Sequence, residues 1–390
     1  MTGYTGGLLP YRSKPQPDES LSSWIARIAV GNGLRLHTFS HLTWPGRQIW
    51  NRDVDGLSDR ALVEKMASVT GTPLDRADKT VIASLEGWLF EKHCPNSTTR
   101  WVLRAGVYHR IRRYCGQQYC PRCLAEDEKP YYRLAWRQAW VTACPTHKSL
   151  LLERCPQCRS PVMFHRPAMK ARPIVECGQC GFDLRKAPIR GVVDSLALTF
   201  QVANAQILER GWTQLGPYSL PYSFTYFDIM HQVARVLATG PRAAGLRAVV
   251  AKQWGGDADP PVPPSGRDRY EIERLDTLSR HRVLGATART MADWPKRFTN
   301  ACIEADLWQS WALRDQDFPP FALWEPVRNH VYRPFYVLTR GEIAEARRYL
   351  MRRGQRPGPA ALKRLLGLGS EKFSTPRFRA PSPALRLARC

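Results

Sequence analysis

Long apolar runs and acidic residues are both scarce in this chain of 390 residues. No run reaches the roughly 18 apolar residues that a membrane-spanning helix needs, which excludes a membrane-spanning protein. The N-terminal residues do not combine a charged leader with an apolar stretch, so we expect an unsecreted, cytoplasmic protein. Asp and Glu number only 34 against 58 Lys and Arg, which gives a net charge of +24. A polyanionic partner is the plainest physical reason for such an excess.

Catalytic motifs are missing as well. The sequence contains no G-x-x-x-x-G-K-[ST] loop, no H-E-x-x-H and no G-x-S-x-G, so we expect neither ATP hydrolysis nor the hydrolases that those motifs mark. A metal-dependent nuclease is the alternative from a different class, and it would need acids that converge from separate elements. The densest acids lie in turn-like segments, where solvated loops are the default: Asp53, Asp55, Glu126, Asp127 and Glu128. The prediction is a protein that is not an enzyme and has no catalytic residues.

The length exceeds one typical core, because domains hold about 100–200 residues. We predict a mainly α fold with small zinc-ribbon or zinc-knuckle elements. Four segments are expected: an N-terminal helical region resembling a helix-turn-helix over residues 10–110, a tandem zinc-finger region over 111–188, a helical domain over 189–330 with a Pro/Gly loop at 255–266, and a basic helical region over 331–390. A plain helical bundle is the equal alternative for the first segment.

Apolar periodicity and capping residues predict several helices. Asp18 and Ser20 are candidate caps of a first helix that starts at Leu21 and stops at Gly31-Asn32-Gly33. The further predicted helices are Ser58–Thr70, Pro73–Leu89, Glu271–Leu284, Thr290–Leu313, Thr339–Arg353 and Ala360–Leu366.

The last sixty residues are the most basic part of the chain, with fourteen Lys and Arg against three acids. The candidate nucleic-acid contacts there are Arg347, Arg348, Arg352 and Arg353. The turn Gly367-Leu368-Gly369 could open a second helix-turn-helix, although Pro376 cuts short any following recognition helix. A solvated basic tail is the alternative.

The strongest signal is a set of paired ligands of the kind that zinc prefers. Two-residue gaps let one turn present two ligands to one ion, and a four-ligand tetrahedral site has a structural role. In chain order the ligands are Cys120, Cys123, Cys144, His147, Cys155, Cys158, Cys177 and Cys180. We predict two structural zinc ions, with the first four residues on one ion and the last four on the other. A crossed pairing is the alternative. The residues that fall outside the pattern are Cys94, Cys115, His165, Cys302 and Cys390.

Several motifs resemble the TniQ family, whose TniQ and TnsD proteins select transposon targets. They are the segment Asp18-Glu19-Ser20-Leu21-Ser22-Ser23-Trp24-Ile25-Ala26-Arg27, then Glu86-Gly87-Trp88-Leu89, Tyr132-Arg133-Leu134-Ala135-Trp136-Arg137 and the first three cysteine motifs. The resemblance covers roughly residues 10–185, and Trp294-Pro295-Lys296-Arg297-Phe298 is similar to a weaker C-terminal motif.

The resemblance implies a DNA-transposition adaptor without catalytic activity. Its implied partners are an AAA+ transposon ATPase of the TnsC/TniB type, DNA and, in CRISPR-associated transposons, a Cascade effector complex with guide RNA. A homodimer is a further expectation. The alternative function is a direct, sequence-specific DNA-binding protein that marks an attachment site.

Overall fold

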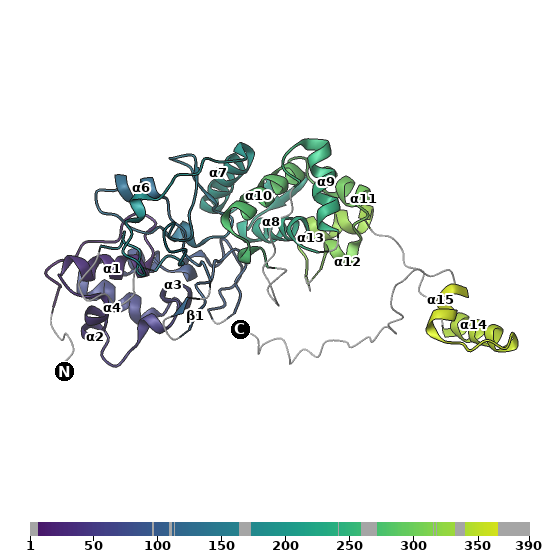
Figure 1. Ribbon diagram of the computed structural model, residues 1–390, viewed down its shortest axis with the longest axis horizontal. Coiled ribbons are helices and arrows are strands. Elements are labelled where there is room, and N and C mark those ends of the chain that lie inside the picture. Colours follow the sequence, from purple (N-terminus) through teal and green to yellow (C-terminus); the bar gives the residue numbers. More distant parts are fainter. Residues whose placement is uncertain are drawn as a thin grey trace. The chain divides into compact units, whose positions relative to one another are not determined.

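The computed structural model describes residues 7–95, 97–108, 111–112, 114–163, 173–240, 242–258, 271–314, 316, 318–331 and 340–365 (Figure 1). The chain divides into two compact units, Met1–Tyr332 and Arg333–Cys390. The described part is mainly helical, with three two-stranded antiparallel sheets, so the predicted fold class is confirmed. Whether the four predicted segments fold independently stays a prediction.

The first unit opens with short helices around α1 (Leu21–Gly31), whose apolar side chains are buried. Ser20 caps α1 by accepting a hydrogen bond from the Ser23 N–H, and Gly33, with φ 69°, turns the chain after it. The elements that follow are α2 (Leu36–Thr43), η1 (Ile49–Asn51), α3 (Val54–Leu57), α4 (Arg60–Thr70), α5 (Leu74–Asp78) and η2 (Ile82–Leu85). The predicted first helix is confirmed, and Ser58–Thr70 is confirmed except that α4 begins at Arg60.

The prediction of one helix over Pro73–Leu89 is wrong, because α5 ends at Asp78. The Thr80 hydroxyl donates to the Ala77 carbonyl at 2.7 Å, and the Thr80 carbonyl accepts from the Leu21 N–H at 2.8 Å. Both contacts hold the chain out of the helical path, and side-chain bonds of this kind compete with helix formation.

The middle of the first unit has little regular structure. Its elements are β1 (Val107–Tyr108), β2 (Ile111–Arg112), α6 (Pro121–Glu126), η3 (Leu134–Arg137), β3 (Ala143–Cys144), β4 (Ser149–Leu150) and η4 (Leu184–Lys186). Buried side chains of this region, among them Tyr119, Tyr132 and Trp140, belong to the same apolar cluster as the helices that follow. The region therefore shares its core with the helices that follow, whereas most buried apolar side chains of the N-terminal helices form a second cluster.

The remaining helices of this unit pack around α10 (Thr277–Met291), which contacts α7, α8, α9 and α11 (Figure 1). In chain order the elements are α7 (Ser195–Arg210), β5 (Thr213–Leu215), β6 (Tyr218–Leu220), α8 (Ser223–Ala238), α9 (Ala243–Trp254), η6 (Ile272–Arg274), α10, α11 (Lys296–Glu304), α12 (Gln309–Ala312), α13 (Phe321–Pro326) and the π-helical turn η7 (Val327–Val331).

The predicted helix boundaries around α10 are wrong. Residues 271–284 form η6 and the first half of α10, because Asp276 caps α10 by accepting from the Ser279 N–H. Residues 290–313 are split between α10, α11 and α12, with Pro295 directly before α11. A proline in this position cannot continue the preceding helix. Of the predicted loop at 255–266, residues 259–266 lie outside the described residues.

The second unit contains α14 (Arg340–Arg352) and α15 (Pro359–Leu365). The two helices bury Ala346, Leu350 and Leu362 against each other. The bounds of α14 confirm the helix predicted over Thr339–Arg353. The helix predicted over Ala360–Leu366 corresponds to α15, which begins and ends one residue earlier. The predicted turn at 367–369 and Pro376 lie outside the described residues.

The segment from Glu19 to Arg27 ties α1 to the rest of the first unit through buried polar contacts. Glu19 accepts from Arg27 at 2.6 Å, and both side chains are buried. Ser22 donates to the Asp55 carboxylate from its N–H and from its hydroxyl, both at 2.7 Å. The Tyr132 N–H donates to the Ser23 hydroxyl at 2.9 Å. Glu19, Ser22, Ser23 and Arg27 belong to the first segment that resembles the TniQ family, and these contacts give them structural roles.

A buried arginine joins the N-terminal helices to the middle of the unit. Arg137, with 2% of its side chain exposed, donates to Asp53 at 2.6 Å and to Asp55 at 2.7 Å. It also donates to the Leu103 carbonyl at 3.1 Å. Burial lowers the pKa of Arg137, but Asp53 and Asp55 outweigh it and raise the pKa above its usual value, so the guanidinium stays charged.

We expect the change Arg137→Met to destabilise the first unit by about 3–5 kcal/mol, because it leaves the buried Asp55 carboxylate without its partner. Arg185→Met is the matched control: Arg185 is 44% exposed and pairs with Asp183 at 2.9 Å, so its loss should cost at most about 1 kcal/mol. Urea denaturation of both variants measures the difference. Equal midpoints for the two variants would contradict a structural role for Arg137.

Candidate metal centres

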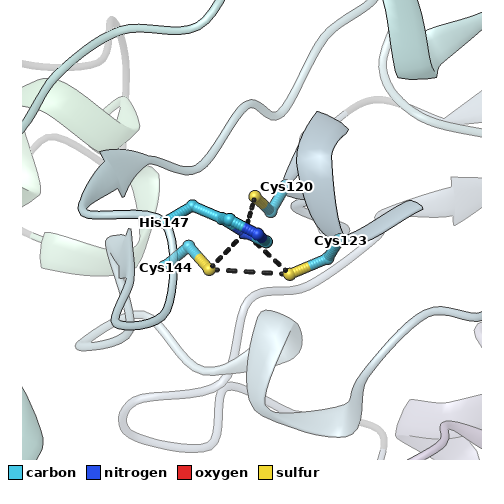
Figure 2. A group of neighbouring side chains, drawn as sticks. All are labelled: Cys120, Cys123, Cys144 and His147. Atoms are coloured by element: carbon cyan, nitrogen blue, oxygen red, sulfur yellow. Dashed lines mark hydrogen bonds between the residues drawn. The ribbon is translucent and has the colours of Figure 1, made fainter. Parts of the chain in front are cut away.

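The first candidate metal centre lies between α6 and the hairpin of β3 and β4 (Figure 2). Cys120 immediately precedes α6 and Cys123 lies in its first turn, with Pro121 at the start of the helix. Cys144 ends β3, and His147 lies in the turn before β4. Figure 2 shows the three sulfur atoms grouped around the imidazole ring of His147.

The distances in this centre fit a tetrahedral ion. His147 Nδ1 lies 3.3 Å from each of the three Sγ atoms, and the Sγ atoms of Cys123 and Cys144 are 3.5 Å apart. All four ligand atoms lie within 4.8 Å of one another. Zn–S bonds of about 2.3 Å give tetrahedral edges of roughly 3.8 Å, slightly longer than these separations. The four residues can therefore hold one metal ion with no further ligand.

A carboxylate outside the four ligands orients the histidine. His147 Nε2 lies 2.8 Å from Glu126 Oε2, so its N–H donates to the carboxylate and leaves Nδ1 free to bind a metal. This hydrogen bond is the main cause of the lowered pKa of Glu126, to which Arg122 also contributes. The sequence predicted a solvated turn for Glu126, whereas Glu126 is the last residue of α6. Its position three residues after Cys123, at the end of the same helix, was the available signal.

The second candidate centre is built from two turns that face each other. Cys155 and Cys180 have their Sγ atoms 3.7 Å apart, and Cys158 and Cys177 have theirs 3.6 Å apart. The Ser160 hydroxyl lies 3.1 Å from the Cys158 sulfur and 3.5 Å from the Cys177 sulfur, where it can donate to thiolates. Cys180 is exposed, whereas the three cysteines of the first centre are buried. The second centre is thus the more accessible of the two.

The structure groups the ligands in sequential order, four residues at each centre, and not in the crossed order. Two further described cysteines, Cys115 and Cys302, belong to neither group, and Cys302 is buried in the apolar core. Cys94 lies apart from both groups. His165 and Cys390 lie outside the described residues.

Four of the five acids considered for catalysis have other partners, and the fifth, Glu128, is exposed. Asp53 and Asp55 bind Arg137, and Asp127 accepts from both Arg133 amino groups at 2.9 and 3.1 Å. Glu126 binds His147. Within the described ranges, the two cysteine-containing groups are the ones whose ligand atoms converge as a metal site requires.

The four candidate nucleic-acid contacts lie on or directly after α14, in the second unit. Arg347, Arg348, Arg352 and Arg353 are all exposed. The Arg353 guanidinium stacks over the Tyr349 ring, 4.9 Å from its centroid. Exposed arginines on one helix are available for phosphate contact.

We expect the full chain to purify with two metal ions, as measured by elemental analysis. Cys123→Ser removes a ligand of the first centre and should lower the content to one ion, whereas Cys94→Ser is the control that keeps two. Glu126→Gln should keep both ions in metal-containing buffer but weaken the first centre about 10–100-fold in a chelator competition. Unchanged metal content in Cys123→Ser would exclude it as a ligand.

One of the comparisons with known proteins found a family for part of the chain. The family model of TniQ matches residues 10–151, a range that includes the N-terminal helices and all four ligands of the first centre but stops before the second. No curated protein matches the chain. None of the helices in the described ranges is long and apolar enough to cross a membrane. The resemblance seen in the sequence is therefore confirmed over residues 10–151: the chain carries the TniQ region of the TniQ family, whose members act in transposon target selection.

Proposed function

We propose that this protein is a non-catalytic adaptor in transposition, which links a target-recognition complex to the AAA+ transposon ATPase and, through it, to the transposase. The observation that carries the proposal is the TniQ match over residues 10–151. The target-recognition complex of this proposal is a Cascade effector with guide RNA, and the adaptor acts as a homodimer.

We further propose that zinc is the ion in both candidate centres. Three cysteines with one histidine, and four cysteines, are the ligand sets of structural zinc sites. Each set fills a tetrahedral ion and leaves no position for a substrate, which supports a structural role. In a region with little regular structure, the binding free energy of zinc contributes to folding.

The buried contacts support an adaptor, because an adaptor has to hold separate binding surfaces in a fixed relation. Arg137 connects the N-terminal helices to the segment between the ligand pairs of the first centre. Further along the chain, Gln118 and Glu153 accept from Arg280 of α10 at 2.9 and 3.5 Å. Arg137 thus joins the metal-binding region to the N-terminal helices, and Arg280 joins it to α10, in both cases through a buried charge.

A direct, sequence-specific DNA-binding protein is the second candidate. It is favoured by the exposed arginines of α14, the same residues that a base-reading or phosphate-binding helix would use. In that case the second unit would provide the specificity, and replacing one base-reading arginine would relax preference at one base at a cost of about 1–3 kcal/mol.

Two binding measurements separate these functions. An adaptor should retain the purified ATPase in a pull-down treated with nuclease, and its DNA binding should show little preference for one site. The variant with Arg347, Arg348, Arg352 and Arg353 changed to Gln should keep ATPase binding. If each arginine neutralises one phosphate, the slope of the logarithm of the variant's DNA-binding constant against the logarithm of salt concentration should be shallower by about 0.9 for each arginine replaced.

The opposite outcome identifies the DNA reader. A preference of about 10³ or more for one attachment site over random DNA, lost in the four-arginine variant, would replace the adaptor proposal. Failure to bind the ATPase with or without DNA would also count against the adaptor.

A further inference from the structure

A cavity of about 340 Å³ opens in the first unit, between the segment that precedes and includes α3 and the loop segments 93–99 and 102–107. Two other cavities of the protein hold only about 10 Å³ each. Small-molecule sites have volumes of about 300–1,000 Å³, so this cavity is large enough for one ligand of the size of a nucleotide.

Two arginines without an acidic partner among the described residues line this cavity. Arg52 is exposed, and among the described residues its guanidinium donates to the Asn51 carbonyl alone, at the long distance of 3.4 Å. Arg104 is half-buried and donates to the Thr98 hydroxyl at 3.2 Å. The sequence around Arg104 is strongly basic, since residues 104–113 contain four arginines and no acid. Both guanidinium groups have donors left over for an anion.

The one carboxylate in the cavity wall is already neutralised. Asp53 Oδ1 accepts from Arg137 at 3.1 Å and from the Gly56 N–H at 3.2 Å. Asp53 Oδ2 accepts from Arg137 at 2.6 Å and from the Ala105 N–H at 3.1 Å. Because these bonds satisfy both oxygens, Asp53 fixes the wall and its charge is compensated by Arg137.

The remaining wall supplies apolar surface and is held in place. Leu57 and Val102 contribute apolar side chains. His93 lies 2.8 Å from the Gly56 carbonyl through its Nε2, which joins the 93–99 segment to α3. A wall with apolar surface next to two guanidinium groups that have no acidic partner among the described residues suits a ligand that combines a flat base with a phosphate.

We propose that this cavity binds one nucleotide unit, with its phosphate on Arg52 and Arg104 and its base against Leu57 and Val102. The ligand is a free nucleotide or one nucleotide of a nucleic-acid strand, since both present the same chemistry. The proposal does not rest on the adaptor function, because it concerns residues far in sequence from the arginines of α14 and requires no transposition partner.

Calorimetric titration of the full chain tests this site. A nucleoside monophosphate should bind with one site per chain, and both the unphosphorylated nucleoside and inorganic phosphate should bind at least about tenfold more weakly, since each lacks half of the contacts. A short DNA strand that binds more tightly than the free nucleotide identifies nucleic acid as the source. Equal affinity identifies a free nucleotide.

Matched variants attribute the binding to the cavity. Arg52→Gln combined with Arg104→Gln should weaken nucleotide binding at least about tenfold, while Arg185→Gln, which removes one exposed charge elsewhere, should change it less than about twofold. Leu57→Trp should reduce binding by filling the cavity without changing the net charge, and its melting temperature shows whether it folds. The proposal is overturned if inorganic phosphate binds as tightly as the nucleotide, or if Arg185→Gln weakens binding as much as the cavity variant. Loss of ATPase binding with intact nucleotide binding would refute only the adaptor function.

Discussion

The buried guanidinium of Arg137 is the contact on which the arrangement of the first unit depends. Removing a charged group from water is costly, and the cost is offset here by two carboxylates from one segment and a carbonyl from another. The same bonds hold Asp53 in the cavity wall and connect α3 to the segment between the ligand pairs of the first metal centre. The N-terminal helices, the metal-binding region and the cavity therefore share one polar junction.

The two metal centres differ in a way that follows from their surroundings. The first centre has three buried cysteines and a histidine oriented by Glu126, and it lies within the range that the TniQ model matches. The second centre has an exposed cysteine and relies on the Ser160 hydroxyl near two of its sulfur atoms. Because the first centre is buried and its histidine is oriented, we expect it to exchange a bound ion less readily than the second centre does.

Spacing and capping in the sequence predicted the features that depend on neighbouring residues. The ligand pairs with two-residue gaps, the Ser20 cap of α1 and the extent of α14 all belong to this group. One error fell where a distant contact overrides the local pattern: the Thr80 carbonyl pairs with the start of α1, and α5 ends before it. The other error missed a local signal, because residues 271–284 divide at Asp276, which caps α10.

The sequence by itself determined the charge, the ligand types, the mainly helical class and the resemblance to the TniQ family, because each of these is written in composition or in short spacing. Only the tertiary structure decided which ligands share a centre, that Glu126 orients His147, and that Arg52 and Arg104 face one cavity beside Asp53. Glu126 and His147 are 21 positions apart in the sequence, and Asp53 and Arg137 are 84 positions apart. Such contacts are fixed by how the chain packs, because the partners lie too far apart in the sequence for a local pattern alone to pair them.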